Sequence, residues 1–562
     1  MQAPHQLTLL EVSMLLDQTE VADSERYGEV FTRRWVVDFI LDLVGYRPEE
    51  DLGGKLLIEP SCGTGAFLVP AIERLVKSAL VHGRALSSLG QAIRAFDLQD
   101  VNASIARKAA VTCLVDAGLD TDAAEEVGNE WIIADDFLLR EQADASADFV
   151  VGNPPYIRLE DVPAARTAEY RRRCPTMRGR ADIYVGFIER GLHLLRADGR
   201  LGFICADRWM RNQYGTSLRE LISKQFAVDL LVGMHDVDAF EDEVSAYPAV
   251  IVLRRGDQHQ VRVVEATQHF DAGGAASVCR WADRVKSESV SSKKFSAAQL
   301  DGWFDSSDLW PTASPSQLEL LRRLEARFGP LEDSSTGARV GIGLATGCDS
   351  VFITDDAELV EEDRLLPLLQ AGDIAGGEVS WSGRFLVNPW NGHGLVDLDQ
   401  FPRLRDYFAQ HEHRLRRRHV AQRRPAEWFR TIDRLNPRLL DVPRLVLPDL
   451  KAAAHPVLDG GRHYPHHNLY WVFPGLWDPE VLGGLLLSDL ANLFVGAYCV
   501  KMRGGCYRFQ AQYVRRIRVP RPDSISPALA RALAAAFRSR DAERATGLAL
   551  QAYDLDSGAL SR

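Results

Sequence analysis

The sequence lacks the features that direct a protein into or across a membrane. None of its apolar runs approaches the ~20 residues that a bilayer-spanning helix needs, although 46% of the 562 residues are hydrophobic. The opening stretch "MQAPHQLTLLEVSMLLDQTE" lacks the basic start and the small-residue cleavage site of a signal peptide. We therefore expect a cytoplasmic protein with no membrane partner.

Cysteine is also scarce, and its spacing excludes the common metal and disulfide frameworks. The chain has 8 cysteines, the nearest pair is Cys499 and Cys506, and no CxxC pattern occurs. Widely separated thiols in a long chain fit a reducing compartment, where cysteine serves as a small core residue. We expect no metal site.

Charge of one sign dominates only part of the chain. The net charge is −12, and nearly all of the acidic excess lies in residues 1–330. Arginine is concentrated in residues 403–434, where histidine, Trp428 and Phe429 are interleaved with it. Such a run is most often a solvated helix face, but arginine among aromatic residues also suits contacts with a phosphate backbone. The run contains Arg403, Arg405, Arg414, Arg416, Arg417, Arg418, Arg423, Arg424, Arg430 and Arg434.

Hydrophobic periodicity divides a chain that is too long for one core. Residues 1–255 alternate short apolar strands with amphipathic helices, which is typical of a doubly wound α/β fold with a mostly parallel sheet. Residues 256–335 are polar and turn-prone, and we predict a connecting segment there. Residues 336–525 are strand-rich, and the Ala- and Arg-rich residues 526–562 predict a helical tail.

A glycine-containing turn follows the first buried strand. In "LLIEPSCGTGAF" the strand ends at Glu59, and Gly63 and Gly65 would let the backbone approach a ligand. The turn has no Walker lysine, which argues against a nucleoside triphosphate. An ordinary strand-to-helix turn explains this stretch about as well, if it is taken alone.

Acidic residues follow the next two predicted strands. Asp97 ends "AFD", where a carboxylate suits the hydroxyl groups of a ribose. Asp136 and Phe137 end "IIADDF", where a carboxylate and a phenyl ring suit an adenine base. A helix-capping aspartate and a core phenylalanine are the simpler explanations of each position by itself.

The fourth strand stops abruptly in "DFVVGNPPY". Asn153 and Pro154 each offer a fixed oxygen acceptor, Pro155 adds no backbone donor, and Tyr156 offers a flat face. This combination suits an amino group on a planar ring. Asn-Pro also starts ordinary turns, but four candidate turns after four successive strands favour a binding site. Phe240, in the polar loop "MHDVDAFEDEV", could add an aromatic face opposite Tyr156.

These stretches, in this order, resemble the γ class of S-adenosylmethionine-dependent DNA N6-adenine methyltransferases, and within it the TaqI-like and Eco57I-like enzymes of bacterial restriction-modification systems. The resemblance covers residues ~25–525. "YGEVFTRRWVVDFI" resembles the first motif, "EPSCGTGAF" the cofactor loop and "VGNPPY" the catalytic tetrapeptide. "VGIGLATGCDSVFI" and "GGCYRFQAQYVRRIRVPRP" resemble parts of the target-recognition domain.

The resemblance implies a fold and a role for each candidate residue. Residues 1–255 would form a Rossmann-like class I methyltransferase domain, and residues 336–525 a mixed α+β target-recognition domain. The cofactor, S-adenosyl-L-methionine, would be bound by Thr32, Glu59, Cys62, Gly63, Gly65, Asp97, Asp136 and Phe137. The catalytic residues would be Asn153, Pro154, Pro155, Tyr156 and Phe240. The chain departs from the family pattern at Arg33, where proline is usual, and by the acidic pair Asp135 and Asp136.

The implied reaction is methylation of N6 of an adenine flipped out of double-stranded DNA. The Asn153 side-chain oxygen and the Pro154 carbonyl would draw the amino hydrogens out of the ring plane and restore lone-pair density on nitrogen, while Tyr156 and Phe240 sandwich the base. A monomer would act on the DNA, with the arginines of residues 403–434 toward the duplex and the acidic catalytic face away from it. A companion restriction endonuclease is a further partner that the resemblance allows.

Two other classes compete with this interpretation. The same Asn-Pro-Pro-Tyr turn could hold a glutamine amide, so a methyltransferase acting on protein glutamine or on RNA is an alternative. A catalytically silent DNA-binding subunit is another, although the intact turns argue against it. We expect no nuclease activity, because "LPDLKAAAH" has the Pro-Asp of a nuclease pattern without a properly placed Glu-x-Lys.

Overall fold

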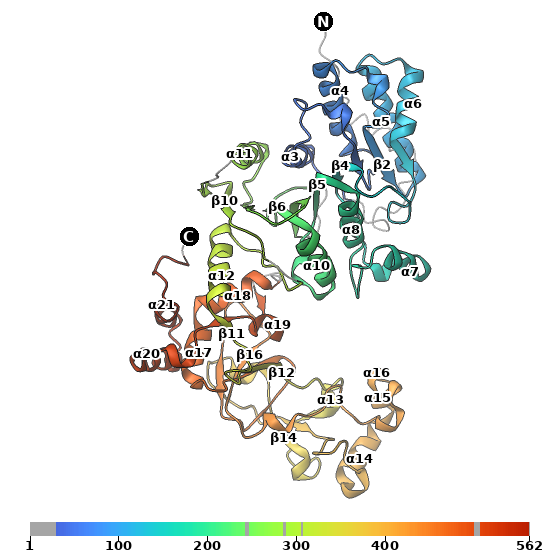
Figure 1. Ribbon diagram of the computed structural model, residues 1–562. Helices are drawn as coiled ribbons and strands as arrows, with labels where there is room; N and C mark the ends of the chain where they lie inside the picture. The colour runs from blue at the N-terminus through green and yellow to red at the C-terminus, as the bar shows by residue number, and fades with distance from the viewer. Residues whose placement is uncertain (1–29, 242–246, 285–287, 305–306, 500–505, 561–562) are drawn as a thin grey trace. The chain divides into compact units, whose positions relative to one another are not determined.

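The computed structural model describes residues 30–241, 247–284, 288–304, 307–499 and 506–560 (Figure 1). The chain forms two compact units, Met1–Leu318 (unit 1) and Glu319–Arg562 (unit 2). The opening residues that lack signal-peptide features, and the first three residues of "YGEVFTRRWVVDFI", lie outside the described ranges.

Unit 1 is built on one large sheet. Its described strands follow the order β3-β2-β1-β4-β5-β7-β6-β8-β10-β9. The strands from β3 to β5 run parallel, β7 runs antiparallel between β5 and β6, and β8 is again parallel to β6. Their bounds are β1 Leu57–Glu59, β2 Ile93–Asp97, β3 Ile132–Ala134, β4 Ala147–Gly152, β5 Leu195–Ala206, β6 Phe226–Gly233, β7 Pro248–Arg255, β8 Val261–Ala266, β9 Val290–Ser291 and β10 Phe295–Leu300. The predicted doubly wound, mostly parallel fold is confirmed.

Helices cover both faces of this sheet, which explains why its central strands are mostly apolar and buried. All six residues of β4 are buried. Phe149 and Val151 share a core with α3 (Arg34–Val44), α4 (Leu68–His82), α5 (Asp100–Asp116) and α11 (Ala272–Ala282). Val150 points to the opposite face, because side chains alternate along a strand, and it lies under Gly191 of α8 (Tyr184–Leu194). A strand buried on both faces needs no polar positions.

The segment predicted as a connection is partly sheet. Residues 256–335 contain the strands β8, β9 and β10, which extend the sheet, and the helix α11. They also contain α12 (Pro315–Arg327), in which unit 1 ends and unit 2 begins. These strands were not predicted, because β10 mixes buried and half-exposed residues and β9 lies at the sheet edge. The helix α6 (Thr121–Trp131) was also missed, since its sequence is strongly acidic on the exposed side. The functional roles given to the domain ranges stay predictions.

Unit 2 mixes short strands with helices, so the predicted excess of strands is wrong, whereas a mixed α+β composition fits. One sheet has the order β12-β20-β16-β18, and another has the order β13-β15-β14-β19. Their bounds are β12 Arg339–Ile342, β13 Ile353–Thr354, β14 Leu365–Leu369, β15 Phe385–Val387, β16 Arg444–Pro448, β18 Val457–Asp459, β19 Tyr464–Pro465 and β20 Leu469–Phe473. The arginine-rich run forms α14 (Pro402–Gln410), α15 (Glu412–Arg416) and α16 (His419–Arg423).

The end of the chain is helical, as predicted. The helices α20 (Pro527–Arg538) and α21 (Ala542–Ala552) pack against α17 (Pro479–Leu487) (Figure 1). The stretch "LGGLLLSDLANLFVGAY" forms two helices rather than one, because α17 ends at the buried Ser488 before α18 (Asp489–Tyr498). Within the described ranges, no single helix is long and apolar enough to cross a membrane. Taken together, α17 and α18 are long and apolar enough to cross one, but the two helices are bent by 64° relative to each other.

Close packing of α3 on β5 predicts a sensitive position at Gly202. A Cβ atom there would lie 2.4 Å from the Val44 Cγ1 atom and 3.2 Å from the Ile40 Cγ2 atom. We expect Gly202→Ala to push α3 off the sheet and to lower the free energy of unfolding by about 1–3 kcal/mol. Denaturant unfolding would measure the loss. Gly273→Ala in α11, where the nearest atoms lie at 3.4 Å, is the control. Equal stability of the two variants would contradict this account of the packing.

Candidate active site

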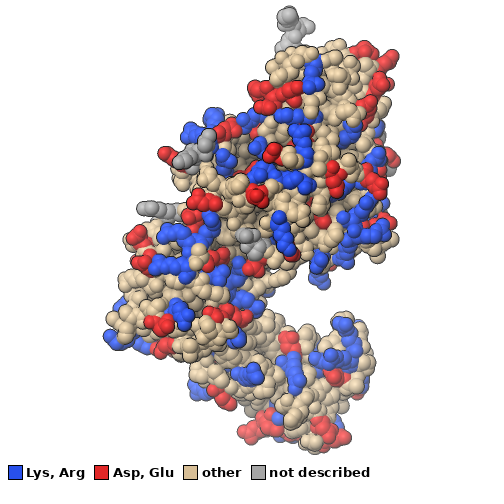
Figure 2. Space-filling view, in the orientation of Figure 1, with Lys and Arg blue, Asp and Glu red and all other residues tan. Residues whose placement is uncertain are grey.

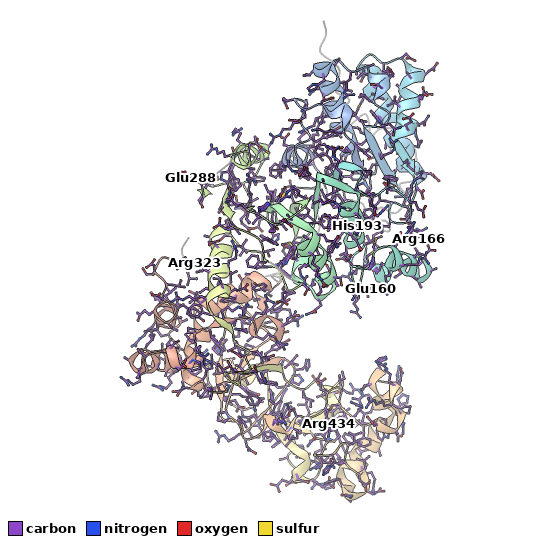
Figure 3. The ribbon with its side chains drawn as sticks, viewed as in Figure 1. Glu160, Arg166, His193, Glu288, Arg323 and Arg434 are labelled. Atoms are coloured by element: carbon purple, nitrogen blue, oxygen red, sulfur yellow. The ribbon has the colours of Figure 1, made fainter. Side chains whose placement is uncertain are left out.

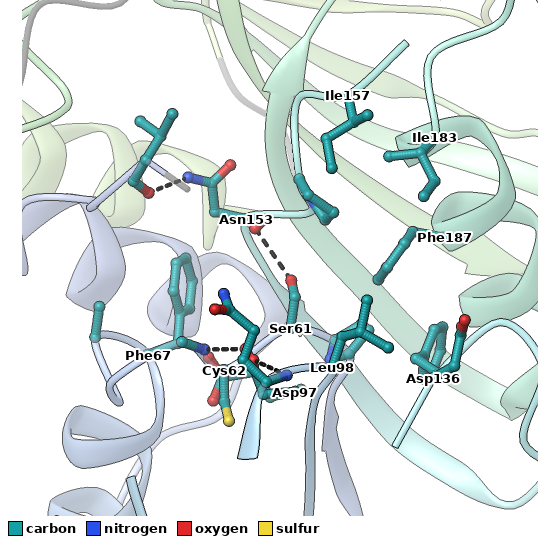
Figure 4. Close-up of a pocket in the computed structure, with 18 of the residues that line it drawn as sticks. Ser61, Cys62, Phe67, Asp97, Leu98, Asp136, Asn153, Ile157, Ile183 and Phe187 are labelled. Atoms are coloured by element: carbon teal, nitrogen blue, oxygen red, sulfur yellow. Dashed lines mark hydrogen bonds between the residues drawn. The ribbon is translucent and has the colours of Figure 1, made fainter. Parts of the chain in front are cut away.

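The four candidate turns meet at one edge of the sheet. The strands β3, β2, β1 and β4 are parallel neighbours, so their carboxyl ends lie together, and the chain crosses from one side of β1 to the other there. Open α/β folds bind ligands at such a crossover. A pocket lies at this edge (Figure 4). The predicted residues that line it are Thr32, Glu59, Cys62, Gly63, Asp97, Asp136, Phe137, Asn153 and Pro155.

The glycine turn after β1 is tied to the turn after β2. The Gly63 N–H donates to Asp97 Oδ2 at 2.9 Å (Figure 4). The Cys62 N–H donates to the Phe96 carbonyl at 2.8 Å. Gly63 and Gly65 have φ of +52° and +109°, which a residue with a Cβ atom rarely adopts. A Cβ atom on Gly63 would meet no atom within 4 Å, so this turn leaves open space beside the pocket.

The Asp97 carboxylate accepts hydrogen bonds from the protein itself. Besides the Gly63 N–H, it accepts from the Gln99 N–H at 2.9 Å. Burial raises the pKa of the Asp97 carboxyl, and these backbone donors act in the opposite direction. Asp97 therefore links the turn after β1 to the turn after β2. Its predicted contact with a ribose stays a prediction.

Glu59 is a buried carboxyl with an unused acceptor. It ends β1, its side chain is buried, and its Oε2 atom has no hydrogen-bond partner among the described residues. Burial raises the pKa of Glu59 well above its usual range, and the nearby Asp97 carboxylate raises it further. A buried oxygen left without a donor costs free energy unless a ligand supplies one.

The acidic pair after β3 divides between surface and pocket. The Asp136 side chain is 12% exposed, whereas that of Asp135 is 42% exposed and forms a salt bridge with Arg140 at 2.7 Å. Asp136 Oδ2 accepts from the Tyr170 hydroxyl at 2.7 Å, which raises the pKa of Tyr170 together with burial. The ring of Phe137 stacks on that of Phe187 at 5.4 Å.

The Asn153 side chain is held by hydrogen bonds from its nitrogen, whereas its oxygen has no partner among the described residues. Its Nδ2 atom donates to the Val30 carbonyl at 2.9 Å and to Thr32 Oγ1 at 3.2 Å (Figure 4). The Val30 carbonyl can only accept, so this contact fixes which end of the amide faces Val30. The Oδ1 atom is left buried and without a partner among the described residues. Pro154 beside it is buried.

Phe240 is placed differently from the expectation. The sequence predicts it in a polar loop, but its backbone pairs with that of Thr32, and it is only 6% exposed. Its ring meets that of Tyr156 edge to face, with centroids 6.4 Å apart and planes at 83°. The two rings thus leave no parallel gap between them, since backbone pairing draws the loop inward. The predicted stacking role of Phe240 stays a prediction.

Several pocket residues were missed in the sequence. Tyr170, Ile157, Ile183 and Phe187 line the pocket together with Phe67. The apolar ones come from loops and helices whose return to the pocket depends on tertiary structure. Tyr170 had a usable signal, because it is the single aromatic residue in the otherwise polar helix α7 (Ala164–Arg173).

A cluster of potential metal ligands occurs in unit 2. Asp349, His466 and His467 offer ligand atoms within 4.8 Å of one another. His466 Nε2 lies 3.3 Å from Asp349 Oδ2 and 3.0 Å from His467 Nδ1. These are direct hydrogen-bonding distances, while the His466 Nδ1 atom is buried and has no hydrogen-bond partner among the described residues.

The strand order and the pocket define a class. A parallel sheet with one antiparallel strand between β5 and β6, and a pocket beside β1 and β4, is the class I S-adenosylmethionine-dependent methyltransferase fold. The solved structure of the type IIL restriction-modification enzyme MmeI in complex with DNA is similar, with a TM-score of 0.54 and 12% identity. The matched region covers 94% of this chain and 75% of the MmeI chain. At this sequence identity the similarity concerns the fold alone.

Relatives in sequence show the family. Residues 88–240 match the family described as Eco57I restriction-modification methylase. Type II methyltransferase M.PaeR7I of Pseudomonas aeruginosa is 43% identical over 94% of this chain and 92% of its own length. M.XhoI of Xanthomonas vasicola is 41% identical over 94% and 97%, and M.BstVI of Geobacillus stearothermophilus is 39% identical over 89% and 91%.

The chain belongs to the type II methyltransferases of restriction-modification systems and carries an Eco57I-like methylase domain. The resemblance to Eco57I-like enzymes is thereby confirmed. The roles of the single residues stay predictions.

The state of Glu59 predicts an unusual pH dependence of stability. Its pKa is raised in the folded protein, so the unfolded chain ionises first as pH rises above the ordinary value of 4.5. The folded state then binds more protons, and its stability falls with rising pH. We expect the stability of Glu59→Gln to decline less steeply than that of the wild type between this value and neutral pH.

Urea unfolding of the ligand-free protein at a series of pH values would measure both slopes. The exposed Glu49→Gln is the control and should keep the slope of the wild type. Equal slopes for Glu59→Gln and wild type would show that Glu59 is not a buried, desolvated carboxyl.

Proposed function

We propose that this chain transfers the methyl group of S-adenosylmethionine to N6 of an adenine in double-stranded DNA, as the modification enzyme of a restriction-modification system. The observation that carries the proposal is the Asn153 amide, whose Nδ2 atom is used by the protein and whose buried Oδ1 atom has no partner among the described residues. A fixed, bare acceptor suits an amino group, because each N–H of that group needs an acceptor.

The pocket residues fit the proposed cofactor. The unpartnered Glu59 Oε2 atom suits a ribose hydroxyl, and the turn at Gly63 leaves open space beside the pocket. Asp136 lines the pocket together with the apolar Ile157 and Phe187, where a planar base would find both an acceptor and apolar contact. When bound, S-adenosylmethionine supplies a methyl group that is already activated by its sulfonium charge.

The chain's own residues would activate the amino nitrogen. The nitrogen lone pair of adenine is delocalised into the ring, so the amino group is a weak nucleophile. Asn153 Oδ1 and the Pro154 carbonyl would each accept one amino hydrogen and favour a pyramidal nitrogen with a localised lone pair. These oxygens would stabilise the positive charge that develops on nitrogen as it takes the methyl group, and the methylated nitrogen would then lose one proton to solvent.

The position of the turn favours a flipped base. Asn153 lies at the sheet edge in a half-buried turn beside the pocket, which a base stacked inside an intact duplex would not enter, so the target would have to leave the stack. Tyr156 would give the extrahelical base a face to rest on. In its present position Phe240 supports the Tyr156 ring edge-on, and stacking by Phe240 would require a different orientation of these rings.

The arginines of residues 403–434 do not all have the same surroundings. Arg418 donates to the carbonyls of Thr346, Trp428 and Arg430 and is half-buried. Arg418 therefore stabilises the local fold by joining three backbone segments. In contrast, Arg414, Arg417 and Arg423 are exposed, and no salt bridge joins them to a described carboxylate. We infer that these three arginines, on and around α15 and α16, face DNA phosphates, and that residues 336–525 select the target sequence.

The test is transfer of labelled methyl from S-adenosylmethionine to unmethylated bacterial DNA, with the product nucleosides identified by mass spectrometry. We expect label in N6-methyladenine. Asn153→Ala should retain cofactor binding by calorimetry and lose about 10²–10³-fold in rate, as when one preorganised hydrogen-bonding group is removed from a transition state. The exposed Asn129→Ala is the control and should keep the wild-type rate.

Label in another nucleoside would overturn the adenine assignment. Label in protein or RNA but not in DNA would overturn the substrate. Undiminished transfer by Asn153→Ala would remove Asn153 from the catalytic role.

A further inference from the structure

The chain leaves the pocket and returns to it around one excursion, residues 158–181, which we call the arginine loop. At its base the Ile183 N–H donates to the Ile157 carbonyl at 2.8 Å, and the Leu159 N–H donates to the Ala181 carbonyl at 2.9 Å. Ile157 and Ile183 both line the pocket (Figure 4). The arginine loop therefore rises directly from the site and is closed at its stem.

The inner side of the arginine loop is anchored. Leu159, Cys174 and Met177 are buried. The Tyr170 hydroxyl donates to Asp136 at 2.7 Å, and Thr176 Oγ1 donates to Glu189 at 2.5 Å. With its helix α7 fixed in this way, the loop presents its outer side chains from a defined platform.

The outer side of the loop is basic in an otherwise acidic part of the chain. The side chains of Arg158, Arg172 and Arg180 are 66%, 74% and 89% exposed. Figure 2 shows Lys and Arg side chains gathered over the region of α7, and Figure 3 places Arg166 at the periphery of unit 1. The arginines are Arg158, Arg166, Arg171, Arg172, Arg173, Arg178 and Arg180, against the acidic residues Glu160, Asp161 and Glu169.

Internal ion pairs do not neutralise this charge. Arg158 and Arg180 share Glu160, at 3.9 Å and 3.5 Å, and Arg172 lies 4.0 Å from Glu169, which are long and exposed contacts that stabilise a fold little. Arg166 and Arg173 pair outside the loop, with Asp136 at 4.0 Å and with Glu141 at 3.4 Å. Arg171 donates instead to the Gly179 carbonyl at 2.7 Å. Favourable interaction with the helix dipole explains the arginines in the last turn of α7, but not Arg158 or Arg180, which lie outside that helix.

We propose that the arginine loop binds the phosphates of the DNA strand next to the target base. The inference rests on the proposed function and names a contact surface for it on the catalytic unit. It departs from the expectation that the acidic catalytic face turns away from the duplex. Every basic residue of the loop is arginine, whose planar guanidinium donates two parallel hydrogen bonds to a phosphate. The anchored stem would place these contacts beside the pocket.

The test compares two charge-matched triple variants of the full chain. One is Arg158→Gln, Arg172→Gln and Arg180→Gln. The control is Arg84→Gln, Arg280→Gln and Lys293→Gln, which removes three positive charges from the same unit outside the loop. Fluorescence anisotropy with a labelled duplex of mixed sequence, across a series of KCl concentrations, gives the slope of log K against log salt concentration. This slope is negative, and each lost phosphate contact makes it less steep by about 0.9, so we expect the slope of the loop variant to be less steep than that of the wild type by about 2.7.

The control should keep the wild-type slope, and both variants should bind S-adenosylmethionine as the wild type does in calorimetry. If the wild type methylates DNA and the loop variant keeps its slope, the inference fails while the proposed function stands. If both variants lose slope equally, net charge rather than the loop is responsible, and the inference also fails. A wild type that neither binds nor methylates DNA overturns the proposed function and the inference with it.

Discussion

The orientation of the Asn153 amide is the constraint on which the rest of the site depends. Its Nδ2 atom is held by the Val30 carbonyl and by Thr32 Oγ1, 123 and 121 residues away in sequence. That segment is in turn paired with the backbone around Phe240 and continues into α3. The packing of α3 on β5 therefore reaches the chemistry, since a shift of α3 would release the amide and let its oxygen find a partner within the protein.

The site keeps unsatisfied groups where a fold alone would pair them. Glu59 Oε2 and Asn153 Oδ1 are both buried without partners among the described residues, and each such group costs about 1–3 kcal/mol. Asp97, by contrast, is fully engaged with backbone donors and holds the turns after β1 and β2 together. Asp97 thus stabilises the turns themselves, whereas Glu59 Oε2 and Asn153 Oδ1 stay available for ligands.

Much of this fold followed from the sequence because its signals are local. Short apolar strands, glycine turns and the Asn-Pro-Pro-Tyr stretch predicted the sheet and the residues at its edge, among them Glu59 and Asp97. Long-range packing escaped prediction. The buried position of Phe240 depends on pairing with Thr32, and the contact of Tyr170 with Asp136 depends on the return of α7 to the pocket. The strands β8 and β10 escaped prediction because half-exposed polar residues such as Arg262 and Gln299 interrupt their apolar pattern, and β9 is a two-residue strand at the sheet edge.

The most direct measurement is a crystal structure of the protein with a cofactor analogue and a duplex that contains its target, once sequencing of modified DNA has located that target. The account predicts an extrahelical adenine whose N6 atom lies within hydrogen-bonding distance of Asn153 Oδ1, with Nδ2 still bonded to the Val30 carbonyl. A stacked target base, or an Asn153 amide turned so that Nδ2 faces the base, would contradict it.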